Sequence, residues 1–179
     1  NGSFEEYLSR LDKKQRHEVR RKLRRVEEVN SKWYTIDAAS PIDEAVVDFI
    51  ELHKKSRPDK HVFMAPHMQE FFVAMARQLH PQGWLQLDFL EIDGERAATI
   101  LNFVYRNDVL VYNSGYDPIR YGNFSPGIVL FARSIQDAIT ARRRRFDFLR
   151  GDEEYKYRFG ARNTEVYELH ITRGKSNLR

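Results

Sequence analysis

Three strand-like segments follow one another closely between Leu85 and Gly115, and they constrain the fold more than any other feature. Leu85, Leu87 and Phe89 alternate with polar residues, which is the pattern of a strand with one buried face. The dipeptide Asp93-Gly94 comes next and is typical of a tight hairpin. Further strand segments follow it and are separated by short turns, at Glu95–Tyr105 and Val109–Gly115. This spacing predicts an antiparallel sheet of strands that are neighbours in sequence.

The third of these strands leads through a loop into a helix that begins at Ser125-Pro126-Gly127. Serine is a frequent N-cap, and proline suits the first helical position because its missing N–H would have no partner there. Gly127 leaves the first turn uncovered, and the helix carries no acidic residue before Asp137. The first N–H groups of a helix lack internal partners and carry partial positive charge. The segment is therefore either an ordinary capped helix or a binding site for an anion such as a phosphate.

The other segments give a mixed order of helices and strands. Ser40-Pro41-Ile42-Asp43 predicts a helix start with a cap, a proline at the first position and an acid at the third. The helix after Ser125 separates two strands, which predicts that these two strands run parallel. Helices are expected from Phe4 to Leu11, from Asp12 to Val26, from Ile42 to before Pro58, from Met68 to Leu79 and within 151–160; a loop is expected over Arg57–Ala65 and strands over Trp33–Ile36, Phe146–Leu149 and Glu165–Thr172.

Size and composition indicate one folded domain. The chain has 179 residues, 41% of them hydrophobic, and no cysteine, which excludes disulfides and cysteine nucleophiles. No apolar run is long enough to span a membrane and no signal peptide is evident, so we expect a cytoplasmic protein without membrane insertion. The two loop histidines, His61 and His67, are only weak evidence for a metal site, so no metal site is expected. The chain begins with Asn1 rather than methionine, as a piece of a longer protein would.

The positive charge is concentrated in two segments. The net charge is only +4, but Lys13–Arg25 and Arg142–Arg145 are strongly basic. Such segments either attract phosphate-rich partners or form solvated helix faces and ends. No aromatic residue occurs within Lys13–Arg25, so a stacking surface for single-stranded nucleic acid is not favoured.

Several short sequences, together with this order of elements, resemble a known family. The strings are Tyr116-Asp117-Pro118, Ser125-Pro126-Gly127 and the stretch from Phe146 through Gly151 to Lys156. They resemble the GNAT acyltransferase superfamily, and within it the CelD-like branch associated with bacterial cellulose and envelope polysaccharide synthesis. That branch is related to the Fem-type aminoacyl transferases. The resemblance covers nearly the whole chain, which would then form a single domain, residues 1–179, and the C-terminal half of a longer two-domain protein.

The resemblance implies an α+β (α/β) fold with a mixed sheet and helices on both faces. The sheet would be mostly antiparallel, with one central parallel pair of strands that splay apart. Acetyl-CoA or another acyl-CoA would lie between them as co-substrate, with no metal. Its pyrophosphate would lie over the start of the helix, although the usual arrangement of Arg or Gln and two spaced glycines is not present. The implied cofactor-binding residues are Tyr112, Asn113, Ser114, Arg120, Asn123, Phe124, Ser125, Gly127, Ile128 and Lys156.

The same resemblance implies direct attack of an amine or hydroxyl on the thioester. Tyr155, with Tyr157 in reserve, would protonate the leaving thiolate, and a backbone N–H of the strand at Val109–Gly115 would polarise the carbonyl. Asp152 and Glu153 would bind the acceptor or act as base. That strand carries no carboxylate at the place where many relatives keep a base, so the base stays open; the weaker candidates are Asp88, Glu91 and Asp117.

Three functions follow from these observations. The first is an acyl-CoA-dependent N- or O-acyltransferase, most simply an acetyltransferase, that acts on a small molecule or saccharide, with its own N-terminal domain as partner. The second is a Fem-type transferase that uses aminoacyl-tRNA bound by Lys13–Arg25. The third is a catalytically silent domain of the same fold.

Overall fold

A five-stranded mixed sheet forms the centre of the molecule. The computed structural model describes residues 2–37 and 39–171. The strands lie in the order of the sequence, and β5 runs parallel to β4 whereas all other pairs are antiparallel. The mixed sheet expected from the sequence is therefore confirmed. The strands are β1 (Ser31–Thr35), β2 (Leu85–Ile92), β3 (Glu95–Tyr105), β4 (Asp108–Tyr116) and β5 (Arg145–Asp147).

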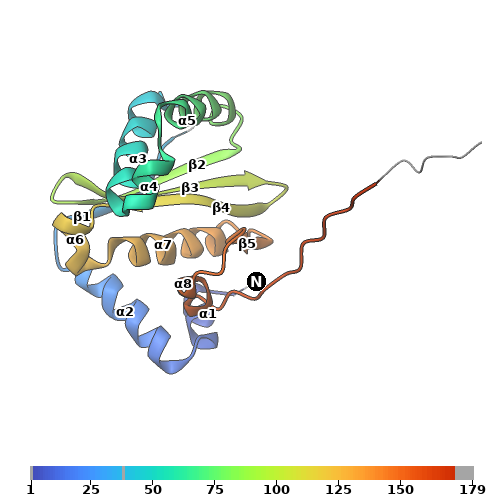
Figure 1. Ribbon diagram of the computed structural model, residues 1–179. Helices are drawn as coiled ribbons and strands as arrows, with labels where there is room; N and C mark the ends of the chain where they lie inside the picture. The colour runs from blue at the N-terminus through green and yellow to red at the C-terminus, as the bar shows by residue number, and fades with distance from the viewer. Residues whose placement is uncertain (1, 38, 172–179) are drawn as a thin grey trace, which may run out of the picture.

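Helices cover both faces of this sheet, also as expected (Figure 1). On one face lie α1 (Phe4–Arg10), α2 (Lys13–Glu27) and α7 (Pro126–Thr140); on the other lie α3 (Asp43–Ser56), α4 (Pro58–Phe63) and α5 (Pro66–Leu79). Short helices occupy the connections, namely α6 (Pro118–Tyr121), the 3-10 helix η1 (Gly122–Phe124) and α8 (Glu154–Arg158). Each face has its own apolar core, so the sheet is buried on both sides over most of its length.

The hairpin between β2 and β3 has the predicted turn. Asp93 and Gly94 adopt φ values of 53° and 81°, the left-handed pair that a tight hairpin requires. The turn between β3 and β4 is built in the same way by Arg106 and Asn107, at 47° and 67°. Both turns lie where the sequence places them.

Two predictions about α3 and α4 are wrong. The predicted helix start at Ser40-Pro41 does not form, since α3 begins at Asp43. Ser40 instead belongs to a turn in which its N–H donates to the Asp37 carbonyl (2.9 Å). The segment predicted as a loop contains α4, which begins with Pro58 at its first position. Proline is favoured there, so the same rule that was applied to Pro41 would have predicted α4.

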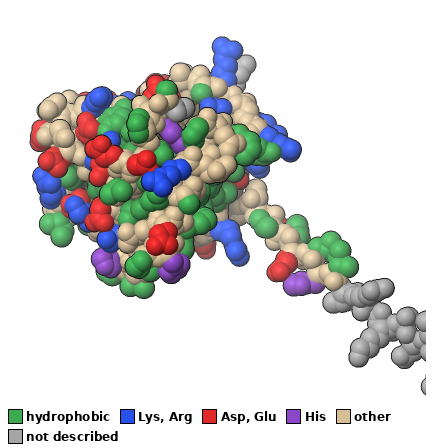
Figure 2. Space-filling model, turned by 90° about the horizontal axis from the view of Figure 1, so that it is seen from above, with side chains coloured by type: hydrophobic (Ala, Val, Ile, Leu, Met, Phe, Trp, Pro, Cys, Tyr) green, Lys and Arg blue, Asp and Glu red, His purple; other side chains and the backbone are tan. Residues whose placement is uncertain are grey.

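The strand expected at Glu165–Thr172 is absent over its described part. Residues 165–171 are irregular and lead away from the body of the protein, with apolar side chains along them (Figures 1 and 2). Val166, Tyr167 and Ile171 are each more than 80% exposed, so no burial stabilises a strand here. Thr172 lies outside the described residues. Within the described residues β5 is therefore an edge strand, and the parallel pair lies at the edge of the sheet rather than at its centre.

None of the helices in the described part of the chain combines the length and apolar character needed to cross a membrane.

Candidate active site

Strands β4 and β5 separate after only three paired residues. The last pair is Leu110 with Asp147, although β4 continues to Tyr116. Tyr112 is an extra residue in β4, since the register with β3 passes from Val111 directly to Asn113. A bulge of this kind bends its strand and ends pairing locally. The family resemblance implied that these two strands diverge, and the bulge supplies a physical cause from the side of β4.

The chain after β5 turns away from β4 as well. Leu149 has φ 55°, a left-handed conformation that is costly for a bulky side chain, and Gly151 has φ 111°. The turn is held by the Leu149 N–H, which donates to the Asp147 carboxylate at 2.8 Å. The gap is thus bounded by a bulge on one side and by a strained turn on the other.

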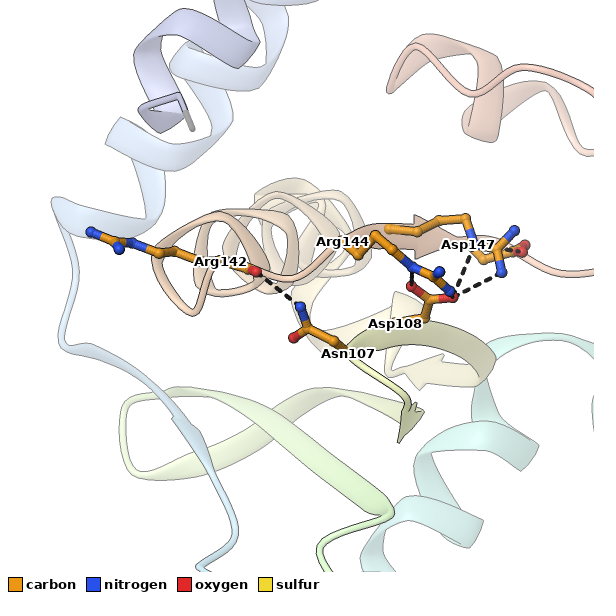
Figure 3. Close-up of polar contacts among 6 residues, drawn as sticks. Asn107, Asp108, Arg142, Arg144 and Asp147 are labelled. Carbon is orange, nitrogen blue, oxygen red and sulfur yellow. Dashed lines mark hydrogen bonds and ion pairs between the residues drawn. The ribbon is translucent and has the colours of Figure 1, made fainter.

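A cluster of charges fastens the end where the two strands remain paired (Figure 3). Asp108, the first residue of β4, accepts two hydrogen bonds from Arg144 (2.9 and 2.7 Å) and further ones from Arg145 (3.2 and 2.8 Å). These bonds hold the pKa of Asp108 down, to about 2. Asn107 adds a bond from its side chain to the Arg142 carbonyl (3.2 Å). Arg144 and Arg145 of the basic run therefore hold the start of β4 to the start of β5.

The gap opens into a cleft of about 770 Å³. Its wall is formed by β4, by the start of α7, by the chain after β5 and by the junction of α3 and α4. The lining residues are Ser56, Arg57, Lys60, Val111, Tyr112, Asn113, Ser114, Tyr116, Gly122, Ser125, Gly127, Ile128, Phe131, Phe148, Leu149, Arg150, Glu153, Tyr155 and Lys156. Of the predicted cofactor-binding residues, this set contains Tyr112, Asn113, Ser114, Ser125, Gly127, Ile128 and Lys156.

The N-terminus of α7 opens into this cleft without a side-chain cap. Ser125 has φ 52° and makes no capping bond with its side chain, so the prediction that it caps the helix is wrong. Its carbonyl instead accepts the N–H groups of Ile128 (3.0 Å) and Val129 (3.2 Å). No acidic residue lies in the first turn. Because no carboxylate of the helix neutralises this end, it can bind an anion.

Three predicted cofactor-binding residues lie outside the cleft wall. Arg120 is exposed and pairs with Glu95 at 3.5 Å. Asn123 is exposed, and Phe124 packs at the edge of the core with Arg25 over its ring. None of the three lines the cleft.

Tyr155 lies on the cleft wall against two aromatic rings. Its ring is 5.0 Å from Phe131 and 6.1 Å from Phe148, measured between centroids. Burial raises the pKa of Tyr155 to about 12. The hydroxyl is therefore protonated near neutral pH. Because it makes no hydrogen bond to any described residue, it is free to donate.

The other predicted catalytic residues divide between the cleft and the surface. Tyr157 and Asp152 are exposed and bond to each other, outside the cleft wall. Glu153 lines the cleft but pairs with Lys156 at 2.8 Å, and this bond holds its pKa down. Lys156 also donates to the carbonyls of Arg150 (2.8 Å) and Gly151 (3.3 Å), so its three donors are used within the protein.

The weaker candidates for the base lie elsewhere. Asp88 is fully buried in β2 and accepts from Thr35 at 2.6 Å; burial raises its pKa to about 7. Glu91 accepts from the Tyr34 hydroxyl (2.5 Å). Asp117 caps α6 through the amides of the next turn and pairs with Lys55. Each of these carboxyls is held by the fold, away from the cleft.

The sequence analysis missed two residues that support this wall of the cleft: Lys60, which lines it, and His53, which is buried and bonds a lining residue. Lys60 of α4 donates to the Ser114 carbonyl (2.5 Å), and His53 of α3 bonds Asn113 (2.9 Å). Asn113 also accepts the Ser114 N–H, so its oxygen faces both groups and His53 must donate. The only sequence feature that could have pointed to Lys60 is Pro58, which indicates the start of the helix that carries it. The described residues hold no cluster of acidic or histidine side chains suited to a metal ion.

A parallel strand pair that opens beside a helix N-terminus without a side-chain cap is the arrangement that the resemblance to the GNAT superfamily implied. Residues 13–157 match the family described as the acetyltransferase (GNAT) domain. The match spans most of the chain, and the chain therefore belongs to the GNAT acetyltransferase family. A search of curated proteins finds no match.

Solved structures of acetyltransferases share the fold at low sequence identity. An aminoglycoside acetyltransferase, meta-AAC0020 from an uncultured soil metagenomic sample in complex with sisomicin, is similar with a TM-score of 0.55 and 13% identity over 83% of this chain and 99% of that chain. The aminoglycoside N-acetyltransferase AAC(6')-Iy in complex with CoA gives 0.55 and 13% over 82% and 97%. A predicted acetyltransferase from Clostridium acetobutylicum with acetyl-CoA gives 0.56 and 12% over 78% and 96%.

Proposed function

We propose that this protein transfers an acetyl group from acetyl-CoA to an amine or hydroxyl of a small acceptor. The observation that carries the proposal is the cleft between β4 and the chain after β5, with the free N-terminus of α7 at its wall. Solved acetyltransferases of similar fold contain CoA or acetyl-CoA, which supports the choice of donor.

The start of α7 would hold the pyrophosphate of the donor. Gly127 leaves room for a close approach, since even an added Cβ would meet only the Tyr116 ring, at 3.5 Å. The pantetheine arm would lie along β4 from Val111 to Ser114, where β5 no longer pairs with the strand. An extended chain with amide groups can bind such an unpaired strand edge by strand addition.

The reaction then needs one bond formed and one broken. The acceptor nitrogen or oxygen attacks the thioester carbonyl, a backbone N–H of β4 stabilises the developing oxyanion, and the C–S bond breaks. Tyr155 is the group on the wall that we assign to protonate the thiolate, because its hydroxyl is protonated and has no partner among the described residues. The acceptor loses its proton to a base or to water.

Amino sugars are the acceptor class that we would test first. One similar structure is an aminoglycoside acetyltransferase with sisomicin bound, which supports a saccharide that carries amines. A role in envelope or exopolysaccharide synthesis, and membership of the CelD-like branch, extend this proposal on the resemblance alone. Because acyl-CoA is supplied inside the cell, we propose that the protein acts in the cytoplasm.

The proposal also includes an N-terminal domain as the partner of this one. Its support is a putative lysylphosphatidylglycerol synthetase from Agrobacterium fabrum, whose C-terminal domain structure has this fold over 75% of the present chain but only 41% of its own (TM-score 0.50, 12% identity).

A substitution at Gly127 tests the phosphate site. In Gly127→Asp the new carboxylate would favour the helix N-terminus, which stabilises the fold, but would repel a pyrophosphate. Two charges at about 4 Å interact by about 4 kcal/mol near a protein surface, so we expect at least a tenfold loss of acetyl-CoA affinity by calorimetry. Gly127→Ala is the matched control and should lose less. Equal affinity of the Asp variant and the unmodified protein would place the phosphates elsewhere.

The Fem-type alternative gains no support from α2. Three of its basic residues are paired with acids: Arg21 with Glu18 (2.7 Å), Lys22 with Glu18 (3.2 Å) and Arg20 with Glu5. Salt-sensitive binding of tRNA without binding of acetyl-CoA would favour that alternative. A silent domain would bind neither donor nor acceptor productively, and Tyr155→Phe would then leave cellular function intact.

A further inference from the structure

Lys60 brings a primary amine to the wall of the proposed acyl cleft. The residue lies on α4, and its Nζ donates to the Ser114 carbonyl of β4 at 2.5 Å. This carbonyl belongs to the part of β4 that has lost its pairing with β5. The amine is therefore held beside the strand along which a thioester would lie.

The other lysines near this site are bound differently. Lys54 pairs with Glu51 at 2.8 Å, and Lys55 pairs with Asp117 at 3.4 Å. Lys156 uses all three of its donors on a carboxylate and two carbonyls. Among the described residues no carboxylate lies within ion-pair distance of Lys60, and its neighbour Asp59 is paired with Arg57 instead. A neutral amine at this position leaves no ion pair broken.

The surroundings of Lys60 favour that neutral form. Burial, reinforced by the charge of Arg57, lowers the pKa of Lys60 to about 8, although Asp59 and Glu153 act in the opposite direction. The nearby His53 is neutral, because burial lowers its pKa to about 4. About half of the Lys60 amines are therefore unprotonated near pH 8, and only the unprotonated amine is a nucleophile.

We propose that Lys60 is itself an acetyl acceptor, modified within the molecule by a thioester bound in the same cleft. This proposal rests on the proposed function. The Nζ lone pair attacks the acetyl carbonyl, an N–C amide bond forms, and the C–S bond breaks. The nitrogen gives up one proton to solvent, and the leaving thiolate takes one, for which Tyr155 is the donor on the wall. No further reactant is needed.

The modification changes the cleft in two ways. The amide formed keeps one N–H, which is enough for the Ser114 carbonyl, but it loses the positive charge. The added acetyl group also occupies space at the junction of α3 and α4, next to Arg57 and Ser56. We therefore expect the acetylated protein to accept external amines more slowly.

The experiment measures acetylation at individual lysines. The protein is incubated with isotope-labelled acetyl-CoA at pH 8, and peptides are mapped by mass spectrometry over time, with Lys54 and Lys55 as internal controls. We expect acetylation of Lys60 at least tenfold faster than of either control, saturation with acetyl-CoA, suppression by excess CoA and a rate that rises from pH 7 to 9. Acetyl phosphate, a donor without CoA, should not reproduce this selectivity.

The variant Lys60→Arg keeps a cation that can donate to Ser114 but cannot be acetylated. The fast addition of one acetyl group to the intact protein should disappear in it. If calorimetry shows that acetyl-CoA binds while Lys60 reacts no faster than Lys54 and Lys55, the inference is refuted and the proposed function stands. If Lys60 stays unmodified and Lys60→Arg slows transfer to an amine probe such as sisomicin, Lys60 is a base and not an acceptor. If acetyl-CoA does not bind, the proposed function fails and the inference fails with it.

Discussion

Replacing Gly115 by alanine should separate α3 from the sheet. A Cβ built on Gly115 would lie 2.4 Å from the His53 amide nitrogen, 2.5 Å from the His53 Cα and 2.5 Å from the Leu52 carbonyl carbon. These are backbone atoms, so no side chain can turn aside. The contacts are roughly 1 Å inside the normal distance between nonbonded atoms, and α3 would have to move by about that amount.

The expected cost of this movement follows from overpacking. An extra methylene in a packed region destabilises by about 1–3 kcal/mol, and backbone contacts place Gly115→Ala at about 3 kcal/mol. For a domain of this size that corresponds to a decrease in Tm of about 6–12 °C. Because His53 of α3 holds Asn113 on the cleft wall, affinity for acetyl-CoA should fall as well.

Gly127→Ala is the matched control for this prediction. Its Cβ would lie 3.5 Å from the Tyr116 ring, an ordinary contact, and alanine is favoured over glycine in a helix by about 1 kcal/mol. Thermal unfolding followed by circular dichroism should therefore give a lower Tm for Gly115→Ala and an unchanged or higher Tm for Gly127→Ala. Equal Tm values for the two variants would refute the close packing of α3 on β4.

Three further outcomes can be checked. Tyr155→Phe should lower kcat for transfer to an amine probe by about 10²-fold or more, with KM little changed; an unchanged kcat would remove Tyr155 as the acid. The bonds from Arg144 and Arg145 stabilise the folded protein above about pH 4 and are lost as pH falls toward the Asp108 pKa near 2, so Asp108→Asn should lower Tm at pH 7 and weaken the loss of stability between pH 4 and 2; parallel pH curves would contradict this. Buried Asp88 stays protonated up to about pH 7 in the folded state but ionises near pH 4 when the chain is unfolded. The free energy of unfolding should therefore fall as pH rises from 4 to 7, by up to about 1.4 kcal/mol per pH unit. Urea titrations should show a smaller dependence on pH for Asp88→Asn, and the same slope in both proteins would count against this.

The order of elements could be predicted because it depends on local patterns. The alternation in β2, the turn residues Asp93 and Gly94, and the apolar stripe of α7 each report on neighbours within a few residues. The parallel relation of β4 and β5 followed from the helix between them. The resemblance to the GNAT superfamily implied that Tyr155, Gly127 and Ser114 share one site, and all three line the cleft.

The rest depends on contacts between residues that are distant in sequence. Lys60 meets Ser114 across 54 residues, and nothing in the local sequence indicates that partner. The bulge at Tyr112 exists only relative to β3, so it has no signature in β4 itself. The segment Glu165–Ile171 has strand-forming composition, but a strand also needs a partner, and no described residue pairs with it. Local propensity alone therefore overestimated this element.

A crystal structure of the protein with acetyl-CoA tests the central claim most directly. The account predicts the pyrophosphate at the start of α7, beside the Gly127 amide, and the thioester arm between Val111–Ser114 and the chain from Phe148 to Arg150. Acetyl-CoA bound elsewhere, for example in the second hollow beside Trp33 and Arg133, with β4 and that chain left untouched, would contradict it.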